Sequence, residues 1–412
     1  MHHHTRVGMP RARTSTRTHA HTSATHASAH ASSRVGARAA ALATTAALVA
    51  ATAGCSLTGG SASPASGGSS GPSGPSTTST TSSGARAAYR CPTDKTEVLV
   101  AGHDSFALSP QLLAAFTAAT GCTATILKSG DAGALTNKLV LTKASPIADA
   151  VFGIDNTFAG RAVSAGVLAS YAAPLPASAT SHAAVGAGAG VLTPIDYGDV
   201  CVNVDTVWFT DKKLNPPVTL DDLLNPEYKD LFVTPGATTS SPGFAFLLAT
   251  IGKYGKDGWA DYWKKLKANG MKVVAGWEDA YTVDFTASGK GKRPIVLSYA
   301  SSPPFTIPQG GTTPTTTALL DTCFRQTEYA AVLAGAKNPD GAKAFVDFML
   351  STQVQQAIPD AMYMFPVDTA APLPKDWAAW AKVAPKPFDV PAADIEANRD
   401  GWLRQWTDVT SG

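Results

Sequence analysis

The chain has 412 residues and a formal net charge of +2. Residues 1–54 contain six arginines and no acidic residue, so subtracting these charges leaves −4 for the rest of the chain. A nucleic-acid-binding surface is therefore not expected. The same segment holds seven of the nine histidines, and only His103 and His182 remain beyond it. This scarcity argues against a histidine-built zinc site and against a histidine-based catalytic relay.

The first 54 residues are typical of a signal peptide. A basic start is followed by an apolar run of small residues at 39–51,. The run is short and alanine-rich, whereas a membrane span needs roughly 20 strongly apolar residues. It ends in Thr52-Ala53-Gly54-Cys55, which resembles a bacterial lipobox. We therefore predict lipidation at Cys55 and an extracytoplasmic protein anchored to the outer face of the cytoplasmic membrane. The alternative is an uncleaved N-terminal anchor.

Residues 55–88 consist almost entirely of Ser, Gly, Thr, Pro and Ala. Such a segment has too few apolar side chains to offset the entropy of ordering, which predicts a disordered tether. The folded part begins near Tyr89. About 320 residues follow, enough for two α/β lobes,.

With Cys55 assigned to lipid, an even number of cysteines remains: Cys91, Cys122, Cys201 and Cys323. Disulfides are expected in an exported chain, and four cysteines allow three pairings. We favour Cys91–Cys122 and Cys201–Cys323, because each pair would lie beside neighbouring strands. Free buried thiols are the alternative.

The first part of the folded chain alternates strands and helices. We expect strands at 97–101, 123–127 and 148–153, a helix between Ser109-Pro110 and Gly121, and a second helix at 134–143. Serine as the N-cap, proline at the first helical position and glycine after the last turn are ordinary helix boundaries. Strands that alternate with helices indicate a parallel sheet.

An Ala/Gly/Ser-rich stretch at 172–189 interrupts this pattern, and two long extended segments follow. Residues 192–204 are a candidate crossover into a second lobe, and 323–332 a candidate return. Between and after them we expect a helix after Pro242, a helix at 257–269, strands at 272–274 and 295–298, a helix from Pro339, and a terminal helix with Trp402 and Trp406.

Two crossovers predict two lobes with a hinge and a cleft between them. We place lobe 1 at 89–195 and 330–412, and lobe 2 at 196–329. In open α/β sheets, ligands bind beyond the carboxyl ends of strands, so the loops after the strands are the candidate site.

These loops carry distinctive segments, which occur in this order along the chain: His103-Asp104-Ser105-Phe106, Gly153-Ile154-Asp155-Asn156, Pro194-Ile195-Asp196-Tyr197-Gly198, Thr239-Ser240-Ser241-Pro242-Gly243, Gly276-Trp277-Glu278-Asp279-Ala280-Tyr281, Leu297-Ser298-Tyr299-Ala300-Ser301-Ser302-Pro303 and Ala357-Ile358-Pro359. In these segments the chain resembles a known family, the periplasmic thiamine-binding proteins of ABC importers. The resemblance covers residues 96–410 and implies the two-lobed type II periplasmic-binding-protein fold.

Thiamine has a flat aminopyrimidine ring, a permanently cationic thiazolium and a hydroxyethyl tail. A binder needs aromatic faces for the rings and carboxylates near the cation. The candidate rings are Trp277, Tyr299 and Tyr363, and the candidate carboxylates are Asp104, Asp131 and Asp155. Ordinary packing is the alternative for each ring, and a solvated or helix-capping role for each aspartate. Trp259 and Trp263 are expected to pack helices.

The resemblance further implies ligand contacts by Ser240 and Ser241, where a helix N-terminus suits a hydroxyl or phosphate. It also implies contacts by Ala132, Ser302 and His103. The family commonly has Gly at the position of Ala132, Tyr at those of His103 and Phe305, and Trp at that of Tyr363. A histidine at 103 makes pH-sensitive binding a hypothesis.

The function implied is the substrate-binding component of an ABC importer, which captures thiamine or its mono- or diphosphate and delivers it to a permease. We expect a monomer, no cofactor, no metal and no catalysis. One alternative is a binder of a polyamine or ferric ion, although ferric binders use a tandem Tyr-Tyr pair that is absent here. The other is a thiamine-degrading enzyme, which would need a cysteine nucleophile in the cleft.

Overall fold

A computed structural model describes residues 89–411. The predicted signal peptide at 1–54, the lipidation site at Cys55 and the tether at 55–88 lie outside the described residues. Within 89–411, no helix combines the length and hydropathy needed to cross a membrane.

The first strands form a parallel sheet, as predicted. The elements are β1 (Glu97–Gly102), α1 (Pro110–Thr120), β2 (Thr123–Lys128), α2 (Ala132–Leu141) and β3 (Ala150–Asp155). Strand β1 pairs in parallel with both β2 and β3. Helix α1 has the predicted boundaries, because the Ser109 side chain accepts a hydrogen bond from the Leu112 N–H and Gly121 ends the helix at φ 72°,.

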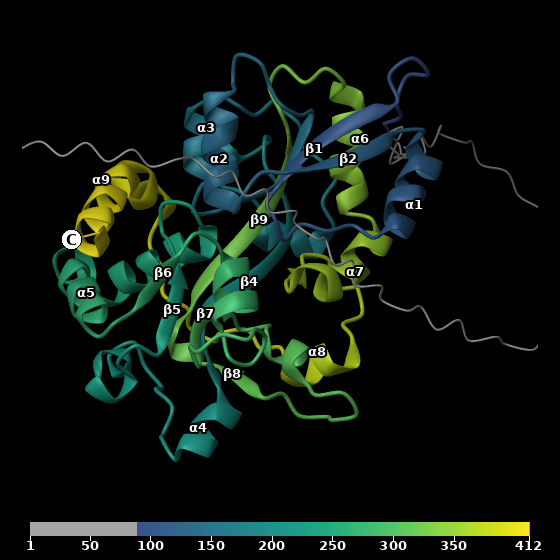
Figure 1. The fold of residues 1–412 in the computed structure, drawn as a ribbon. Coiled ribbons are helices and arrows are strands. Elements are labelled where there is room, and N and C mark those ends of the chain that lie inside the picture. Colours follow the sequence, from purple (N-terminus) through teal and green to yellow (C-terminus); the bar gives the residue numbers. More distant parts are fainter. Residues whose placement is uncertain (1–88, 412) are drawn as a thin grey trace, which may run out of the picture. The chain divides into compact units, whose positions relative to one another are not determined.

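Two long antiparallel strands connect the two ends of the sheet. They are β4 (Thr193–Asp205) and β9 (Phe324–Val332), which pair with each other. Strand β9 also pairs with β3, and β4 also pairs with β7 (Ile295–Tyr299). The strand order is β2-β1-β3-β9-β4-β7-β5-β6, so both predicted crossovers lie in its centre (Figure 1).

The far end of the sheet repeats the parallel arrangement. Strand β7 pairs in parallel with β5 (Phe232–Pro235), which pairs in parallel with β6 (Lys272–Val274). Helix α5 (Ser241–Ala268) is broken at Gly255, whose φ of 74° and ψ of 176° are not helical. The two helices expected from the sequence are thus the two segments on either side of this glycine.

The remaining elements cover the sheet and its edges. They are α3 (Ala159–Ser164), α4 (Thr206–Lys212), β8 (Thr316–Ala318), α6 (Pro339–Met349), α7 (Thr352–Met362), β10 (Phe365–Pro366), α8 (Lys375–Trp380) and α9 (Ala392–Ser411). Helix α9 packs against α5 and α3 (Figure 1). The predicted boundaries place it in lobe 1, and the division into lobes stays a prediction.

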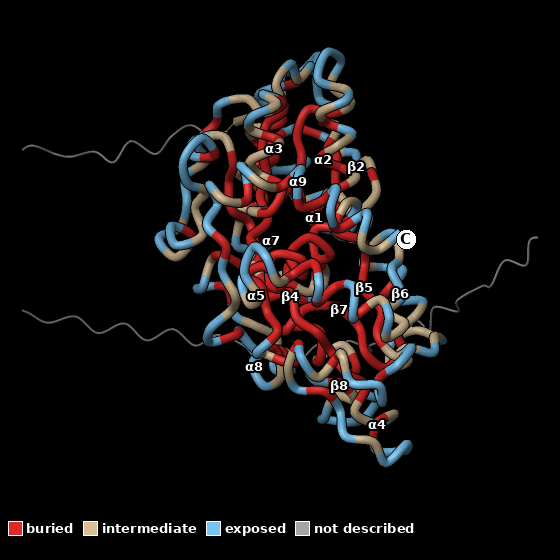
Figure 2. Tube along the Cα trace, turned by 90° about the vertical axis from the view of Figure 1, so that its left-hand side faces the viewer, coloured by how far each residue is buried: buried red, intermediate tan, exposed pale blue. Residues whose placement is uncertain are grey.

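The core follows the sheet from one end to the other (Figure 2). Trp259 and Trp263 are fully buried on α5, and Trp406 of α9 meets the Trp263 ring edge-on at 5.6 Å between centroids. The tryptophans expected to pack helices therefore do so.

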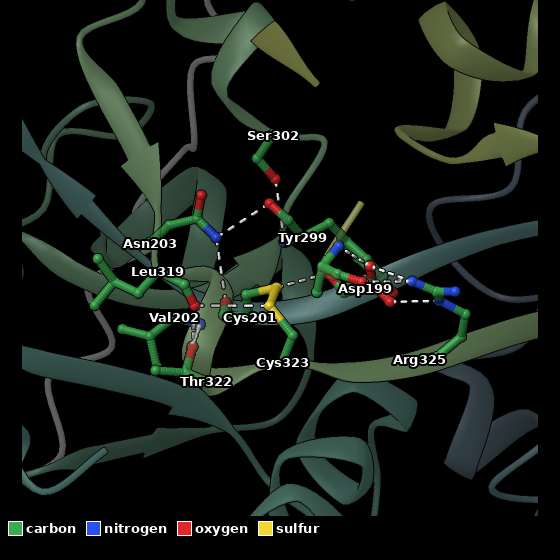
Figure 3. The surroundings of a disulfide bond; sticks show 11 residues. Asp199, Cys201, Val202, Asn203, Tyr299, Ser302, Leu319, Thr322, Cys323 and Arg325 are labelled. Atoms are coloured by element: carbon green, nitrogen blue, oxygen red, sulfur yellow. Dashed lines mark hydrogen bonds and ion pairs between the residues drawn. A yellow bond between two sulfur atoms is a disulfide. The ribbon is translucent and has the colours of Figure 1, made fainter. Parts of the chain in front are cut away.

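The structure contains disulfides between Cys91 and Cys122 and between Cys201 and Cys323, the two pairs that the sequence favoured. The second joins β4 to the residue before β9 (Figure 3). Beside it, the Arg325 guanidinium donates to both carboxylate oxygens of Asp199, at 2.7 and 2.8 Å. Covalent and ionic links thus hold the two crossover strands together at this end.

Candidate ligand-binding site

A cavity lies where the loops after β1 and β2 face the N-terminus of α5, the loop after β6 and the end of α7. Its walls come from both ends of the sheet and from the crossover strand β9. The lining residues are His103, Ser105, Asp131, Ala132, Ser241, Pro242, Trp277, Tyr299, Glu328, Met362, Tyr363 and Met364. The cavity is small in this conformation, about 30 Å³.

Most of the site residues expected from the sequence come together here. Those lining the cavity are His103, Asp131, Ala132, Ser241, Trp277, Tyr299 and Tyr363. They span 261 positions from first to last (363 minus 103, inclusive). Their convergence is a consequence of the fold and not of neighbouring sequence.

Trp277 is the centre of an aromatic group. Its ring stacks on Tyr281 at 5.0 Å between centroids and meets Tyr363 nearly edge-on at 5.5 Å. The indole Nε1–H donates to Ser298 Oγ at 2.9 Å, which fixes the orientation of the ring. Tyr299 lies 6.3 Å from Trp277 between centroids. These rings provide flat faces of the kind on which a planar cation stacks.

Tyr363 ends α7 in a left-handed conformation, with φ 61°. This conformation is costly for a bulky residue and persists only where its surroundings require it. Ser301 Oγ donates to the Tyr363 carbonyl at 2.5 Å, and the Phe305 ring stacks on the tyrosine ring. Both contacts hold the Tyr363 side chain at the cavity.

Asp131 connects the two sides of the cavity. It caps α2, with Oδ1 accepting the Ala132 N–H at 2.6 Å. Across the cavity, Oδ2 accepts the Trp277 N–H at 2.9 Å and Oδ1 the Ser241 N–H at 3.4 Å. Burial raises the pKa of Asp131, and the hydrogen bond from Trp277 opposes that rise,.

The base of the cavity is acidic. Glu328 of β9 lies 3.5 Å from His103 Nε2, measured from Oε1. On the neighbouring strand, Asp196 is directly opposite Glu328 and fully buried. Burial, and then the charge of Glu328, raise the pKa of Asp196 well above its ordinary value. Burial lowers the pKa of His103, but Glu328 and Asp131 outweigh this effect and leave it raised,.

Four predicted site residues lie outside the lining. Asp155 is fully buried behind the cavity, where it accepts hydrogen bonds from Ser241 Oγ and from Thr157; burial raises its pKa to about 7. Ser240 caps α5, with its side chain accepting from the Gly243 N–H.

Ser302 exchanges a 2.8 Å hydrogen bond with Ser298, the acceptor of the Trp277 indole. Asp104 is exposed and accepts from the Gly130 N–H at 2.9 Å. Of the four residues outside the lining, Asp155 and Ser302 therefore support residues that line the cavity, while Ser240 and Asp104 cap or brace loops beside it.

Glu328, Met362 and Met364 line the cavity and were not expected from the sequence. A charged residue within the otherwise apolar end of β9 was the available signal for Glu328. Ser105 and Pro242 also line the cavity, and both lie in segments that carry the family resemblance.

A larger cavity of about 350 Å³ lies between α3 and α9. None of the predicted site residues lines it, and its two arginines are matched by the carboxylates of Glu396 and Asp400, so it offers a cationic ligand no excess negative charge. The aromatic and acidic cavity is therefore the better candidate site.

Two α/β halves joined by two crossover strands, with a cavity between them, define a two-lobed solute-binding protein. Consistent with this class, residues 145–303 match the family model described as bacterial extracellular solute-binding protein. The thiamine-binding periplasmic protein of Brucella melitensis is 31% identical over 325 residues, which cover 77% of this chain and 93% of the relative. The chain belongs to the family of periplasmic thiamine-binding proteins.

Solved structures agree with the fold. A periplasmic thiamin binding protein superposes with a TM-score of 0.68 at 28% identity, covering 78% of this chain and 99% of that chain. Iron-bound HitA from Pseudomonas aeruginosa superposes with a TM-score of 0.56 at 23% identity, covering 76% of this chain and 99% of that one. The second likeness concerns the fold alone.

Proposed function

We propose that this chain is the substrate-binding component of an ABC importer, and that it captures thiamine, or its mono- or diphosphate, outside the cytoplasmic membrane. The observation that carries the proposal is the cavity itself, where the rings of Trp277 and Tyr299 adjoin the carboxylates of Asp131 and Glu328. Rings and carboxylates together suit a flat organic cation. Membership of the thiamine-binding family supports the same ligand.

Capture requires the cavity to open. Its volume of about 30 Å³ is well below the roughly 300 Å³ or more of a ligand pocket,. The contacts that hold it closed, such as Asp131 to the Trp277 N–H, join separate elements and can part without breaking a strand. The two sides would separate, admit the ligand and close on it, and the closed form would be presented to the permease.

Binding is proposed to be the whole function, with no bond made or broken. The relatives are binding proteins, and each of the four cysteines in residues 89–411 belongs to a disulfide. None of them offers the thiolate that a thiamine-degrading enzyme would use. Appearance of a free pyrimidine product on long incubation with thiamine would contradict this part of the proposal.

The proposal also places the protein at the membrane surface. Residues 1–54 would direct export, Cys55 would carry lipid, and 55–88 would serve as a tether for a monomer that does not bind nucleic acid. Lobe 1 at 89–195 and 330–412 and lobe 2 at 196–329 are the proposed moving bodies.

Isothermal titration of the purified protein with thiamine tests the function. The expected dissociation constant is below about 1 µM. No binding, or binding only in the millimolar range, would contradict it. Parallel titrations with thiamine monophosphate and diphosphate rank the three ligands.

A further inference from the structure

The carboxyl pair formed by Asp196 and Glu328 is not explained by the fold. The two residues are directly opposite each other on β4 and β9, so their side chains project from the same face of the sheet a few ångströms apart,. Asp196 is fully buried, and neither of its oxygens has a hydrogen-bond partner among residues 89–411. Glu328, its neighbour, lines the cavity.

Two adjacent buried carboxylates cannot both remain ionised without a nearby cation, because desolvation and mutual repulsion both favour the neutral form. Among the described residues, His103 compensates only one member of the pair, with its Nε2 3.5 Å from Glu328. Gln326 Nε2 donates to Glu328 at 3.4 Å, a long and neutral contact. No lysine or arginine forms an ion pair with either carboxyl group within residues 89–411.

Other titratable groups face the same region. Asp131 comes from the start of α2, Asp155 from β3 and Tyr299 from β7, and the phenol of Tyr299 is influenced by all four carboxyl groups. Asp155 has donors of its own in Ser241 and Thr157.

A positive charge also faces this region. The charge of Lys128, at the end of β2, opposes protonation of His103. Strand β10 contributes only Phe365 and Pro366. The pair at 196 and 328 is the least compensated part of this cluster.

We propose that Asp196 holds a proton beside Glu328 in the empty cleft and releases it to solvent when the thiamine cation binds. This inference rests on the proposed function. The pair carries one negative charge with the proton and two without it. The cation of the ligand replaces the proton, so the pair together with its proton or its ligand carries the same net charge of one negative unit in both states.

The proton can be counted by calorimetry. Titrations with thiamine near neutral pH, in two buffers of different ionisation enthalpy, should show the release of about half to one proton per ligand. Affinity should rise with pH, by at most about tenfold per pH unit for each proton released. A neutral analogue, with an uncharged thiophene in place of the thiazolium, should bind without this release. It retains the aminopyrimidine and so controls for that ring's own proton.

Variants identify the group that loses the proton. Asp196→Asn should remove the share of the release that comes from the pair and leave only the share that His103 contributes, and Glu328→Gln should do the same. Asp321→Asn makes the same chemical change at an exposed site and should leave the release unchanged. His103→Gln should still release a proton, because Asp196 and Glu328 remain. Loss of the release in His103→Gln together with its persistence in Asp196→Asn would overturn the inference.

The outcomes separate this inference from the function on which it rests. Tight binding of thiamine with no proton release would overturn the inference and leave the function intact. Absence of binding would overturn both. Equal release with thiamine and with the neutral analogue would also overturn the inference, and this comparison needs only the unaltered protein.

Discussion

Asp131 Oδ2 accepts a hydrogen bond from the backbone N–H of Trp277 at 2.9 Å, across 146 positions of sequence. Asp131 caps α2, and Trp277 follows β6 at the far end of the sheet. One carboxylate therefore joins the two sides of the cavity and also contributes negative charge to it.

Replacing this carboxylate tests both roles. Asp131→Asn should weaken thiamine binding by about 1.5–3 kcal/mol, because the variant loses a charge and one of the acceptors for the N–H groups of Ala132, Trp277 and Ser241,. Calorimetric titration measures the change. Asp376→Asn, an exposed aspartate on α8, serves as the control. An affinity equal to that of the control would contradict the role given to Asp131.

The indole of Trp277 should stack on the ligand. Trp277→Ala is expected to lower thiamine affinity by about 1–3 kcal/mol, and Trp277→Phe by less, since phenylalanine retains an aromatic face. Trp380→Ala is the matched control, because that indole donates to the Thr312 carbonyl away from the cavity. If the alanine variant at 277 binds like the control, the ring only packs against Tyr281.

His103 should make binding depend on pH. Its pKa is raised because Glu328 and Asp131 outweigh the effect of burial, so the imidazolium persists to higher pH than usual. A positive imidazolium repels the ligand cation, and affinity should therefore increase as pH rises through this raised pKa. His103→Gln should make thiamine affinity increase less steeply with pH, and it should strengthen binding at acidic pH. Titrations between about pH 5 and 8 test this; a variant with the same pH profile as the unaltered protein would be inconsistent with it.

The two disulfides should differ in their contribution to stability. Cys201–Cys323 closes a separation of 122 residues and Cys91–Cys122 one of 31. Loop-closure entropy then predicts losses of about 5 and about 4 kcal/mol when each pair is replaced by alanines. Urea unfolding of both double variants gives the free energies. A larger loss of unfolding free energy for the 91–122 pair would show that loop-closure entropy does not determine which disulfide stabilises the protein more.

Cys55 should hold the protein at the membrane. Cys55→Ala is expected to shift the protein from the membrane fraction to the soluble extracytoplasmic fraction, because lipid can no longer be attached. Immunoblotting of the two fractions measures this shift, and thiamine affinity should not change. A variant that remains in the membrane fraction would favour the alternative of an uncleaved N-terminal anchor.

Local signals in the sequence were sufficient for much of the fold. Ser109 and Gly121 mark the two ends of α1 as ordinary caps. The alternation of strands and helices predicted the parallel arrangement of β1, β2 and β3. The long elements β4 and β9 also stood out as extended segments. Three short elements did not, because α3, α4 and β5 contain only six, seven and four residues and depend on tertiary contacts,. The three-residue strand β6 was nevertheless predicted.

Part of the site was also predictable from local signals in the sequence. The loops after the strands identified Asp131, Trp277 and Tyr299, since strand ends converge at one edge of a sheet. The pairing of Asp196 with Glu328 depends on the register of β4 on β9, which shifts between Pro194 and Asp196. No local pattern specifies such a register. Likewise, only the folded structure shows that Asp155 accepts from Ser241 and lies behind the cavity.

The most direct measurement is a crystal structure of the protein with thiamine. We expect the ligand between the two sides of the cavity, with a ring against Trp277 and the thiazolium facing the carboxylates of Asp131 and Glu328. Ligand density in the larger cavity between α3 and α9, with the aromatic and acidic cavity closed and empty, would contradict it.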